Sequence, residues 1–141
     1  MGSRRKGRIL AMQALYAWEV GHPPLESLLT FPWIDTEQAS RFDDSTQDFA
    51  RMLVAGVLES LDDVDDEIRA HLENWDFDRI SRVDLALLRL GAYSLMFQKE
   101  IPATVTIDEA IEVAKEYSGD DAYRFINGIL DGVRKSPTAM R

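Results

Sequence analysis

The segment from Ser81 to Phe97 constrains the fold more than any other part of the chain, because its apolar residues leave no polar face. At helical spacing these residues cover every side of the segment: Val83, Leu85, Leu87, Leu88, Leu90, Leu95 and Met96. A helix that is hydrophobic all round is normally buried at the centre of its domain. We therefore expect residues 81–97 to form a central helix surrounded by the other elements.

The rest of the chain repeats the helical apolar period, and no run alternates strictly enough to indicate a sheet. This pattern predicts helices over residues 4–20, 25–29, 48–61, 62–75, 106–117 and 122–135. Residues 31–47 have no clear period and are interpreted as a long, variable connection. The fold class is therefore predicted to be all-α, a bundle of about seven helices.

Two helix boundaries have explicit capping signals. The predicted helix at Thr106 begins with a capping box, in which the Thr106 hydroxyl and the Glu109 carboxylate bond the first free backbone amides. Ser118, Gly119, Asp120 and Asp121 are expected to close that helix and to cap the last one. In the last helix, Gly128 and Gly132 are four residues apart, and we expect both to let a neighbouring helix approach closely.

Length and composition favour a single domain over residues 1–141, with an N-terminal helical part (1–61) and a C-terminal helical part (62–141). The chain has no cysteine, which excludes disulfides and thiolate zinc sites and fits a reducing compartment. Polar residues interrupt the apolar positions of residues 9–20, so this stretch is neither a signal peptide nor a membrane span. We expect a soluble, cytoplasmic protein.

The sequence contains no motif that indicates catalysis. It has no nucleophile elbow, no phosphate-binding glycine loop and no zinc-protease motif, and its carboxylates are scattered. His22 and His71 lack neighbours at metal-ligand spacing. The acidic run Asp62–Glu67 has Glu67 where a calcium loop requires glycine, so we interpret it as a solvated helix start or a surface for a basic protein. We predict no enzyme activity, no cofactor and no metal.

The charges of the chain are distributed unevenly. Arg4, Arg5, Lys6 and Arg8 are basic, whereas residues 9–141 hold 12 basic and 25 acidic residues, a formal charge of −13. Such a chain can bind a polyanion only at its basic end, because the remainder repels it. Single-stranded RNA is the favoured ligand, and a disordered charged tail is the alternative interpretation of the same cluster.

Helical spacing argues against a disordered tail. At about 100° per residue, Arg5, Arg8, Gln13 and Tyr16 fall within a sector of roughly 140° on one helix. Guanidinium groups neutralise phosphates, an amide can bond a base edge, and an aromatic ring can stack on a base. This face of the first helix is therefore predicted to bind RNA.

Four stretches of the chain, taken together and in order, resemble the NusB family of bacterial transcription antitermination factors. They are RRKGR at 4–8 with AMQALY at 11–16, RVD at 82–84 with LLRL at 87–90, VTIDEAIEVAK at 105–115, and RFINGILD at 124–131. The resemblance spans both ends and the middle of the chain, and only residues 22–47 match nothing recognisable. It implies a compact double helical bundle.

The resemblance also implies a function and its site residues. The family's proteins pair with NusE, a small-subunit ribosomal protein, bind the boxA element of nascent ribosomal RNA and make RNA polymerase resistant to termination. By position, the RNA-binding residues are Arg4, Arg5, Lys6, Arg8, Gln13, Tyr16, Phe125 and Asn127. Asp84 and Asp121 match acidic positions for partner contact, the first on the NusE face and the second near the RNA surface.

One position departs from the family pattern. Gly7 replaces a better helix former such as alanine, and we interpret it as letting the basic end fray until RNA orders it.

Two other functional classes fit part of the sequence. RNA methyltransferases carry a NusB-like domain at their N-terminus, but the chain ends at Arg141 without a methyl-donor domain, which favours the antitermination factor. The other class is a protein-binding or self-associating helical module, such as a homodimer, in which the basic end contributes only solubility.

Overall fold

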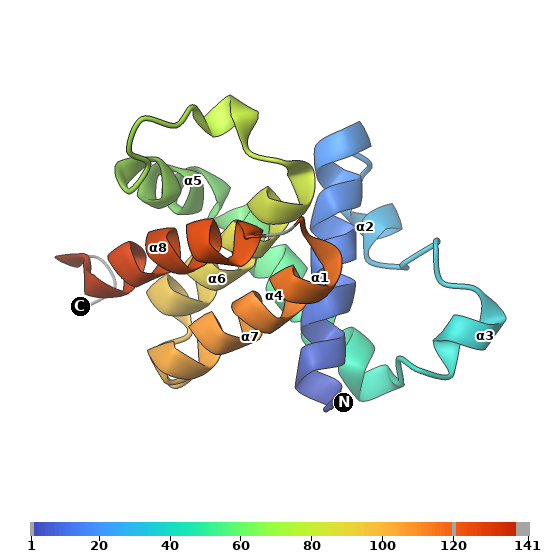
Figure 1. Cartoon of the computed structure of the whole chain (residues 1–141). Helices are drawn as coiled ribbons and strands as arrows, with labels where there is room; N and C mark the ends of the chain where they lie inside the picture. Colours follow the sequence, from blue (N-terminus) through green and yellow to red (C-terminus); the bar gives the residue numbers. More distant parts are fainter. Residues whose placement is uncertain (1, 120, 138–141) are drawn as a thin grey trace.

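The computed structural model describes residues 2–119 and 121–137, and both ranges are almost entirely helical (Figure 1). They contain eight α-helices, one 3-10 helix and no strand. The helices are α1 (Ser3–Gly21), α2 (Leu25–Leu28), α3 (Thr36–Ala39), α4 (Asp44–Glu59), α5 (Leu61–Ala70), α6 (Arg82–Phe97), α7 (Ala103–Tyr117) and α8 (Ala122–Lys135), with η1 (Phe77–Arg79) between α5 and α6. The predicted all-α fold is confirmed.

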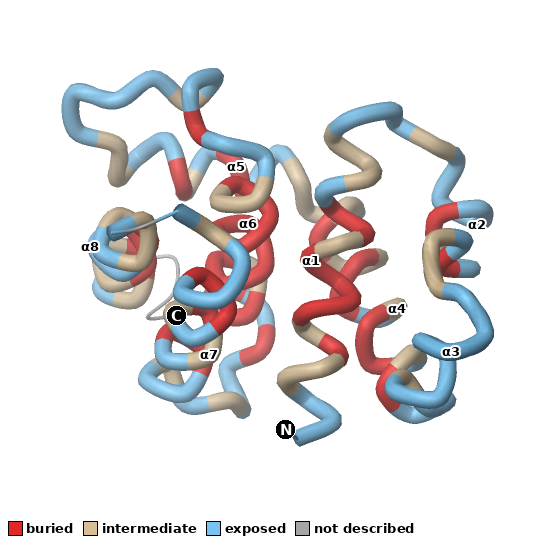
Figure 2. The backbone as a smooth tube through the Cα atoms, turned by 45° about the vertical axis from the view of Figure 1, so that its right-hand side comes forward, coloured by how far each residue is buried: buried red, intermediate tan, exposed pale blue. Residues whose placement is uncertain are grey.

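Helix α6 is the centre of the core, as its sequence predicts. Figure 2 shows α6 buried along most of its length, and Leu88 is completely inaccessible to solvent. Its first turn is capped by Ser81, whose side chain accepts a hydrogen bond from the backbone N–H of Asp84. Helix α6 packs against α1 and α4 on one side and against α5, α7 and α8 on the other, which produces a double bundle (Figures 1 and 2).

The segment between α2 and α4 is more ordered than the sequence predicts. Asp35 and Gln38 form a reciprocal capping box that begins α3, a single turn that the sequence analysis missed. The N-cap of α4 is Asp43, which accepts from the N–H of Thr46, so this helix starts four residues before the predicted position. The Asp-to-Gln spacing of the box is a sequence signal that could have located α3.

The predicted start of α7 at Thr106 is wrong. The helix begins at Ala103 after the N-cap Pro102, and Thr106 lies inside it with a buried hydroxyl that has no hydrogen-bond partner in the described ranges. Pro102 fixes its own backbone in a conformation suited to entering a helix, which sets the start three residues earlier than the capping motif suggested. Glu109 instead forms an ion pair with α1.

Two further predicted helix boundaries need correction, the end of α5 and the cap at the start of α8. Helix α5 ends at Ala70, five residues before the predicted end at Trp75. Asp121 precedes α8 as its N-cap, but its backbone is left-handed, with φ of 68°, and its side chain makes no capping hydrogen bond. Asp120, part of the same predicted cap, lies outside the described residues.

A buried ion cluster joins both halves of the bundle. Arg89 of α6 is 4% exposed, and its Nε and Nη2 donate to the two carboxylate oxygens of Asp65 on α5, both at 2.9 Å. Its Nη1 donates to Glu19 of α1, also at 2.9 Å. From the sequence we interpreted the acidic run that contains Asp65 as a solvated helix start or a surface for a basic protein. For Asp65 both interpretations are wrong, because its carboxylate is buried. It compensates a buried charge.

The two glycines of α8 differ in their surroundings. A Cβ built on Gly132 lies 2.6 Å from His71 Nδ1, so this glycine permits a close approach of α5, as predicted. A Cβ on Gly128 meets no atom within 4 Å, so the same prediction for Gly128 is wrong. Gly128 is exposed on the outer side of its helix.

Alanine substitutions at Gly56 and Gly128 should change stability in opposite directions. A Cβ on Gly56 would lie 2.3 Å from Cζ of Tyr93, and displacing that ring costs about 1–3 kcal/mol against a helix-propensity gain of about 1 kcal/mol. We expect Gly56→Ala to lower the free energy of unfolding by about 1 kcal/mol. Gly128→Ala should raise it by about 1 kcal/mol in the same urea titration, because only the propensity changes. Equal shifts of the two variants would contradict this packing argument.

None of the helices in the described ranges has the length and apolar character needed to cross a membrane.

Candidate functional site

The basic residues of the N-terminus belong to the first two turns of α1. The helix begins at Ser3 after the N-cap Gly2, and its first turn contains no acidic residue. The positive end of a helix dipole favours anions, and the cations Arg4, Arg5 and Lys6 add to that field. An ordered helix end therefore replaces the disordered tail considered from the sequence.

Aromatic and acidic neighbours hold these cations in place. The guanidinium carbons of Arg4 and Arg8 lie 4.4 Å and 5.6 Å from the centre of the Phe49 ring on α4. Arg5 forms a two-bond ion pair with Glu109 of α7, through Nε at 2.8 Å and Nη2 at 3.1 Å. Burial lowers the pKa of Arg8, but an arginine stays charged near neutral pH. Among these three arginines, Arg5 is the one that pairs with a carboxylate of the described residues.

The Arg5–Glu109 pair depends on pH. Hydrogen bonding to Arg5 lowers the pKa of Glu109, and the charge of Arg8 acts in the same direction. A lowered pKa means that the pair contributes stability above the ordinary glutamate value of about 4.3. That contribution is lost as the pH falls through the lower pKa of the folded protein. The pair is therefore fully formed at neutral pH.

Gly7 has a packing role in addition to the role in fraying that we predicted from the sequence. The residue is buried inside a regular helix, and a Cβ built there would lie 2.5 Å from Cδ2 of Phe49. The missing side chain lets the Phe49 ring approach α1 closely, beneath Arg4 and Arg8. The close contact between α1 and α4 opposes fraying of the basic end.

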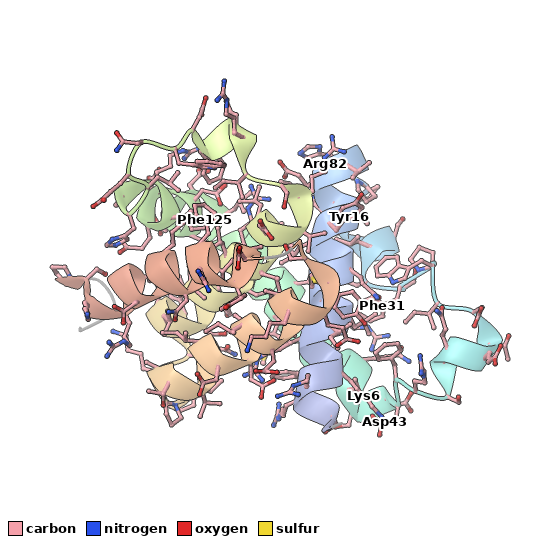
Figure 3. The ribbon with its side chains drawn as sticks, viewed as in Figure 1. Lys6, Tyr16, Phe31, Asp43, Arg82 and Phe125 are labelled. Atoms are coloured by element: carbon pink, nitrogen blue, oxygen red, sulfur yellow. The ribbon has the colours of Figure 1, made fainter. Side chains whose placement is uncertain are left out.

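Gln13 and Tyr16 continue the exposed side of α1 beyond the basic turns. The indole N–H of Trp33 donates to Oε1 of Gln13 at 3.0 Å, which ties the segment between α2 and α4 to α1. Tyr16 is 42% exposed. Figure 3 shows Lys6 and Tyr16 near opposite ends of α1.

Two adjoining hollows run along this side of α1. One, of about 380 Å³, is lined by Met12, Gln13, Tyr16, Ala17, Trp33, Val83 and Tyr117. The other, of about 540 Å³, is lined by Lys6, Ile9, Gln13, Trp33, Ile34, Gln38, Arg41, Phe42, Glu116 and Tyr117. They share Gln13, Trp33 and Tyr117, so they form one groove, which we call the α1 groove. Its walls are residues 33–42 and the end of α7.

The structure does not bring all predicted site residues together. Phe125 on α8 packs its ring against Trp75 at 5.7 Å between centroids, and Asn127 is exposed on the same helix. Neither residue lines the α1 groove. Asp84 accepts a hydrogen bond from the Ser118 hydroxyl, next to Val83 and Tyr117 at one end of the groove. Asp121 is exposed and lies 3.7 Å from Arg124.

Only Lys6, Gln13 and Tyr16 of the groove were predicted as site residues, and the residues missed include Trp33, Arg41, Phe42 and Tyr117. Trp33, Arg41 and Phe42 lie in the segment interpreted as a variable connection, and Tyr117 was predicted only as the last residue of a helix. The sequence signal was the density of aromatic residues at 31–42, which includes Phe31, Trp33 and Phe42. The spacing of residues within that segment could not show that these aromatic side chains lie against α1.

Comparison with known proteins identifies the family. A sequence profile described as the NusB family matches residues 5–135. The chain belongs to the NusB family. The transcription antitermination protein NusB of Treponema pallidum is 47% identical over 135 residues, which cover 94% of this chain and 93% of the relative. Its name describes a transcription factor, in agreement with the prediction of a non-enzymatic protein.

Solved structures of the NusB family share the fold. T. maritima NusB matches with a TM-score of 0.83 and 39% identity, over 96% of this chain and 92% of that one. A structure of the antitermination factors NusB and NusE in complex with dsRNA matches with a TM-score of 0.80 and 25% identity, over 96% and 98% of the two chains. The double bundle implied by the four sequence stretches is confirmed.

Proposed function

We propose that this chain is a transcription antitermination factor that binds the boxA element of nascent ribosomal RNA together with NusE. In this role it helps RNA polymerase in the antitermination complex to resist termination during ribosomal RNA synthesis. The observation that carries the proposal is the continuity of the ordered basic end of α1 with the half-buried Gln13 and the exposed Tyr16. Phosphates would bind at the first two turns, and bases would lie further along the helix.

The charge distribution supports a requirement for NusE. Outside the four basic residues at the start of α1, the chain has a formal charge of −13, which opposes the approach of RNA. A basic ribosomal protein bound to the acidic surface would reduce that repulsion and add its own phosphate contacts. Asp84 and Asp121 are the proposed partner-facing carboxylates, and Phe125 and Asn127 are the proposed extension of the RNA surface on α8.

Fluorescence anisotropy tests the function directly. A labelled single-stranded boxA RNA is titrated with the protein, with and without NusE, beside a scrambled RNA of equal length. The proposal predicts tighter binding of boxA than of the scramble, and a further gain with NusE. If neither RNA binds with NusE present, the chain is better described as a protein-binding module.

Replacing Glu109 with glutamine should strengthen RNA binding. The carboxylate competes with phosphates for Arg5, and partly exposed ion pairs of this kind contribute about 0.2–1 kcal/mol. We expect Glu109→Gln to raise the affinity for boxA RNA by up to about fivefold in the same assay.

The matched control for this prediction is Glu112→Gln. Glu112 also lies on α7 and carries the same charge, but it pairs with Lys115 at 3.7 Å. It should give a smaller gain, because only the long-range charge changes. Equal gains in affinity from both variants would show that the Glu109 carboxylate does not compete with RNA phosphates for Arg5.

A further inference from the structure

The segment between α2 and α4 presents a fixed wall to α1. Phe31 is 2% exposed although its backbone is left-handed, with φ of 52°, a conformation that a bulky side chain rarely adopts. Arg51 of α4 donates to the Leu29 carbonyl at 3.0 Å, and its guanidinium lies 5.2 Å from the centre of the Phe31 ring. Trp33 stacks edge-on against Phe31 at 5.7 Å. The position of Trp33 is therefore determined by anchored neighbours.

Trp33 in turn determines how the Gln13 amide is oriented. An indole N–H can only donate, so the Gln13 oxygen must face Trp33 and the NH₂ group must point away from it. The described residues provide no hydrogen-bond partner for that NH₂ group. Two N–H donors are thus presented to the α1 groove in one orientation. Such donors are complementary to the carbonyl oxygen or ring nitrogen acceptors of an unpaired base.

The surroundings of Gln13 favour RNA over a protein segment as the occupant. Tyr16 and Tyr117, both 42% exposed, offer two rings on the groove, and stacking on such rings is independent of base identity. Lys6 and Arg41 provide cations, and both line the same hollow as Tyr117. Glu116 is the one carboxylate that residues 2–119 and 121–137 contribute to the lining, so phosphates would follow the side with Lys6 and Arg41. The groove is also continuous with the basic end of α1.

We propose that the α1 groove is a base-reading site for single-stranded RNA, in which Trp33 is a positioning residue that orients the Gln13 amide toward a base acceptor. Tyr16 and Tyr117 stack on bases, and Lys6 and Arg41 neutralise the adjoining phosphates. The inference rests on the proposed RNA-binding function. It assigns specificity to residues 33–42, which none of the four sequence stretches that resemble the family includes.

The test separates base reading from overall affinity. Labelled single-stranded 12-mers, comprising boxA RNA, its single-base replacements, oligo-U, oligo-A and oligo-C, are titrated with the full chain and NusE. The variants are Trp33→Phe, which keeps a ring but removes the N–H donor, and Gln13→Glu, which keeps the acceptor for Trp33 but removes both donors. Trp18→Phe, on the opposite side of α1, is the matched control. Circular dichroism verifies that each variant is folded.

The expected result is a loss of discrimination at one base. For the wild-type protein and Trp18→Phe, one base replacement should weaken binding by about tenfold. Trp33→Phe and Gln13→Glu should reduce that ratio to about one, and the double variant should be no worse than either single variant. Retained discrimination in Trp33→Phe, additive losses, or RNA binding without any base preference would overturn the inference while leaving RNA binding intact. Failure of the wild-type protein to bind any of the RNAs would overturn the proposed function as well.

The cationic side of the groove has an independent readout. Arg41→Gln should reduce the dependence of log affinity on log salt by about 0.7, the value for one phosphate contact on a single strand. Lys135→Gln is the control, because Lys135 is an exposed cation at the C-terminal end of α8 and does not line the α1 groove. An unchanged salt slope for Arg41→Gln would remove Arg41 from the proposed phosphate path.

Discussion

Replacing Arg89 with alanine is expected to lower the free energy of unfolding by about 3–5 kcal/mol, the range for breaking a buried ion pair from one side. The guanidinium holds Asp65 and Glu19, whose side chains are 10% and 29% exposed. Without Arg89 these carboxylates remain close together, partly removed from water and without their cation. Because the free energy of unfolding of a domain is only about 5–15 kcal/mol, this single change should remove a large part of the protein's stability.

Urea unfolding followed by circular dichroism measures this effect. The control is Arg69→Ala, since Arg69 pairs with Asp66 at 3.3 Å but is 52% exposed, and surface pairs contribute less than about 1 kcal/mol. Adding Asp65→Ala to the Arg89→Ala variant should recover part of the loss, because it removes an uncompensated carboxylate. A loss for Arg89→Ala no larger than that for Arg69→Ala would contradict the role assigned to the cluster.

Neutralising the basic end of α1 is expected to abolish most of the salt dependence of RNA binding. Four phosphate contacts on a single strand correspond to a slope of about −2.8 in log affinity against log salt. These four contacts alone should cost roughly 50-fold in affinity between about 50 and 200 mM salt. A variant with Arg4, Arg5, Lys6 and Arg8 all replaced by glutamine should bind weakly, with a slope that is smaller in magnitude by about 2.8 than that of the wild-type protein.

A second quadruple variant controls for net charge. Arg69, Arg79, Lys99 and Lys135 are exposed cations on other parts of the molecule, and their replacement by glutamine gives the same formal charge of −13. If location matters, this variant should retain most of the wild-type slope. Equal losses in both variants would mean that only the total charge of the protein opposes RNA, and the phosphate role of the α1 end would be wrong.

The sequence predictions were accurate where interactions between residues close in sequence decide the structure, and inaccurate where residues far apart in sequence decide it. The boundaries of α1 are within one residue of the predicted ones, because the apolar period and the break at Gly21, Pro23 and Pro24 are local signals. The start of α7 was misplaced because residues that match the capping-box pattern act as a cap only where a helix begins. Here the helix begins earlier, at Ala103. Thr106 instead faces the core, and Glu109 finds its partner on another helix.

The sequence by itself determined the helical fold class, the buried centre at α6 and the location of the positive charge. Each of these depends on residues within one segment, where periodicity and composition act directly. The tertiary structure decided which of the predicted residues act together. Arg5 meets Glu109 across 104 positions, Arg89 meets Glu19 across 70, and Gln13 meets Trp33 across 20. Such pairs depend on how helices pack, and the spacing of residues along one helix contains no information about its neighbour. The α1 groove exists for the same reason, because α1, residues 33–42 and the end of α7 are brought together only by the packing of the helices.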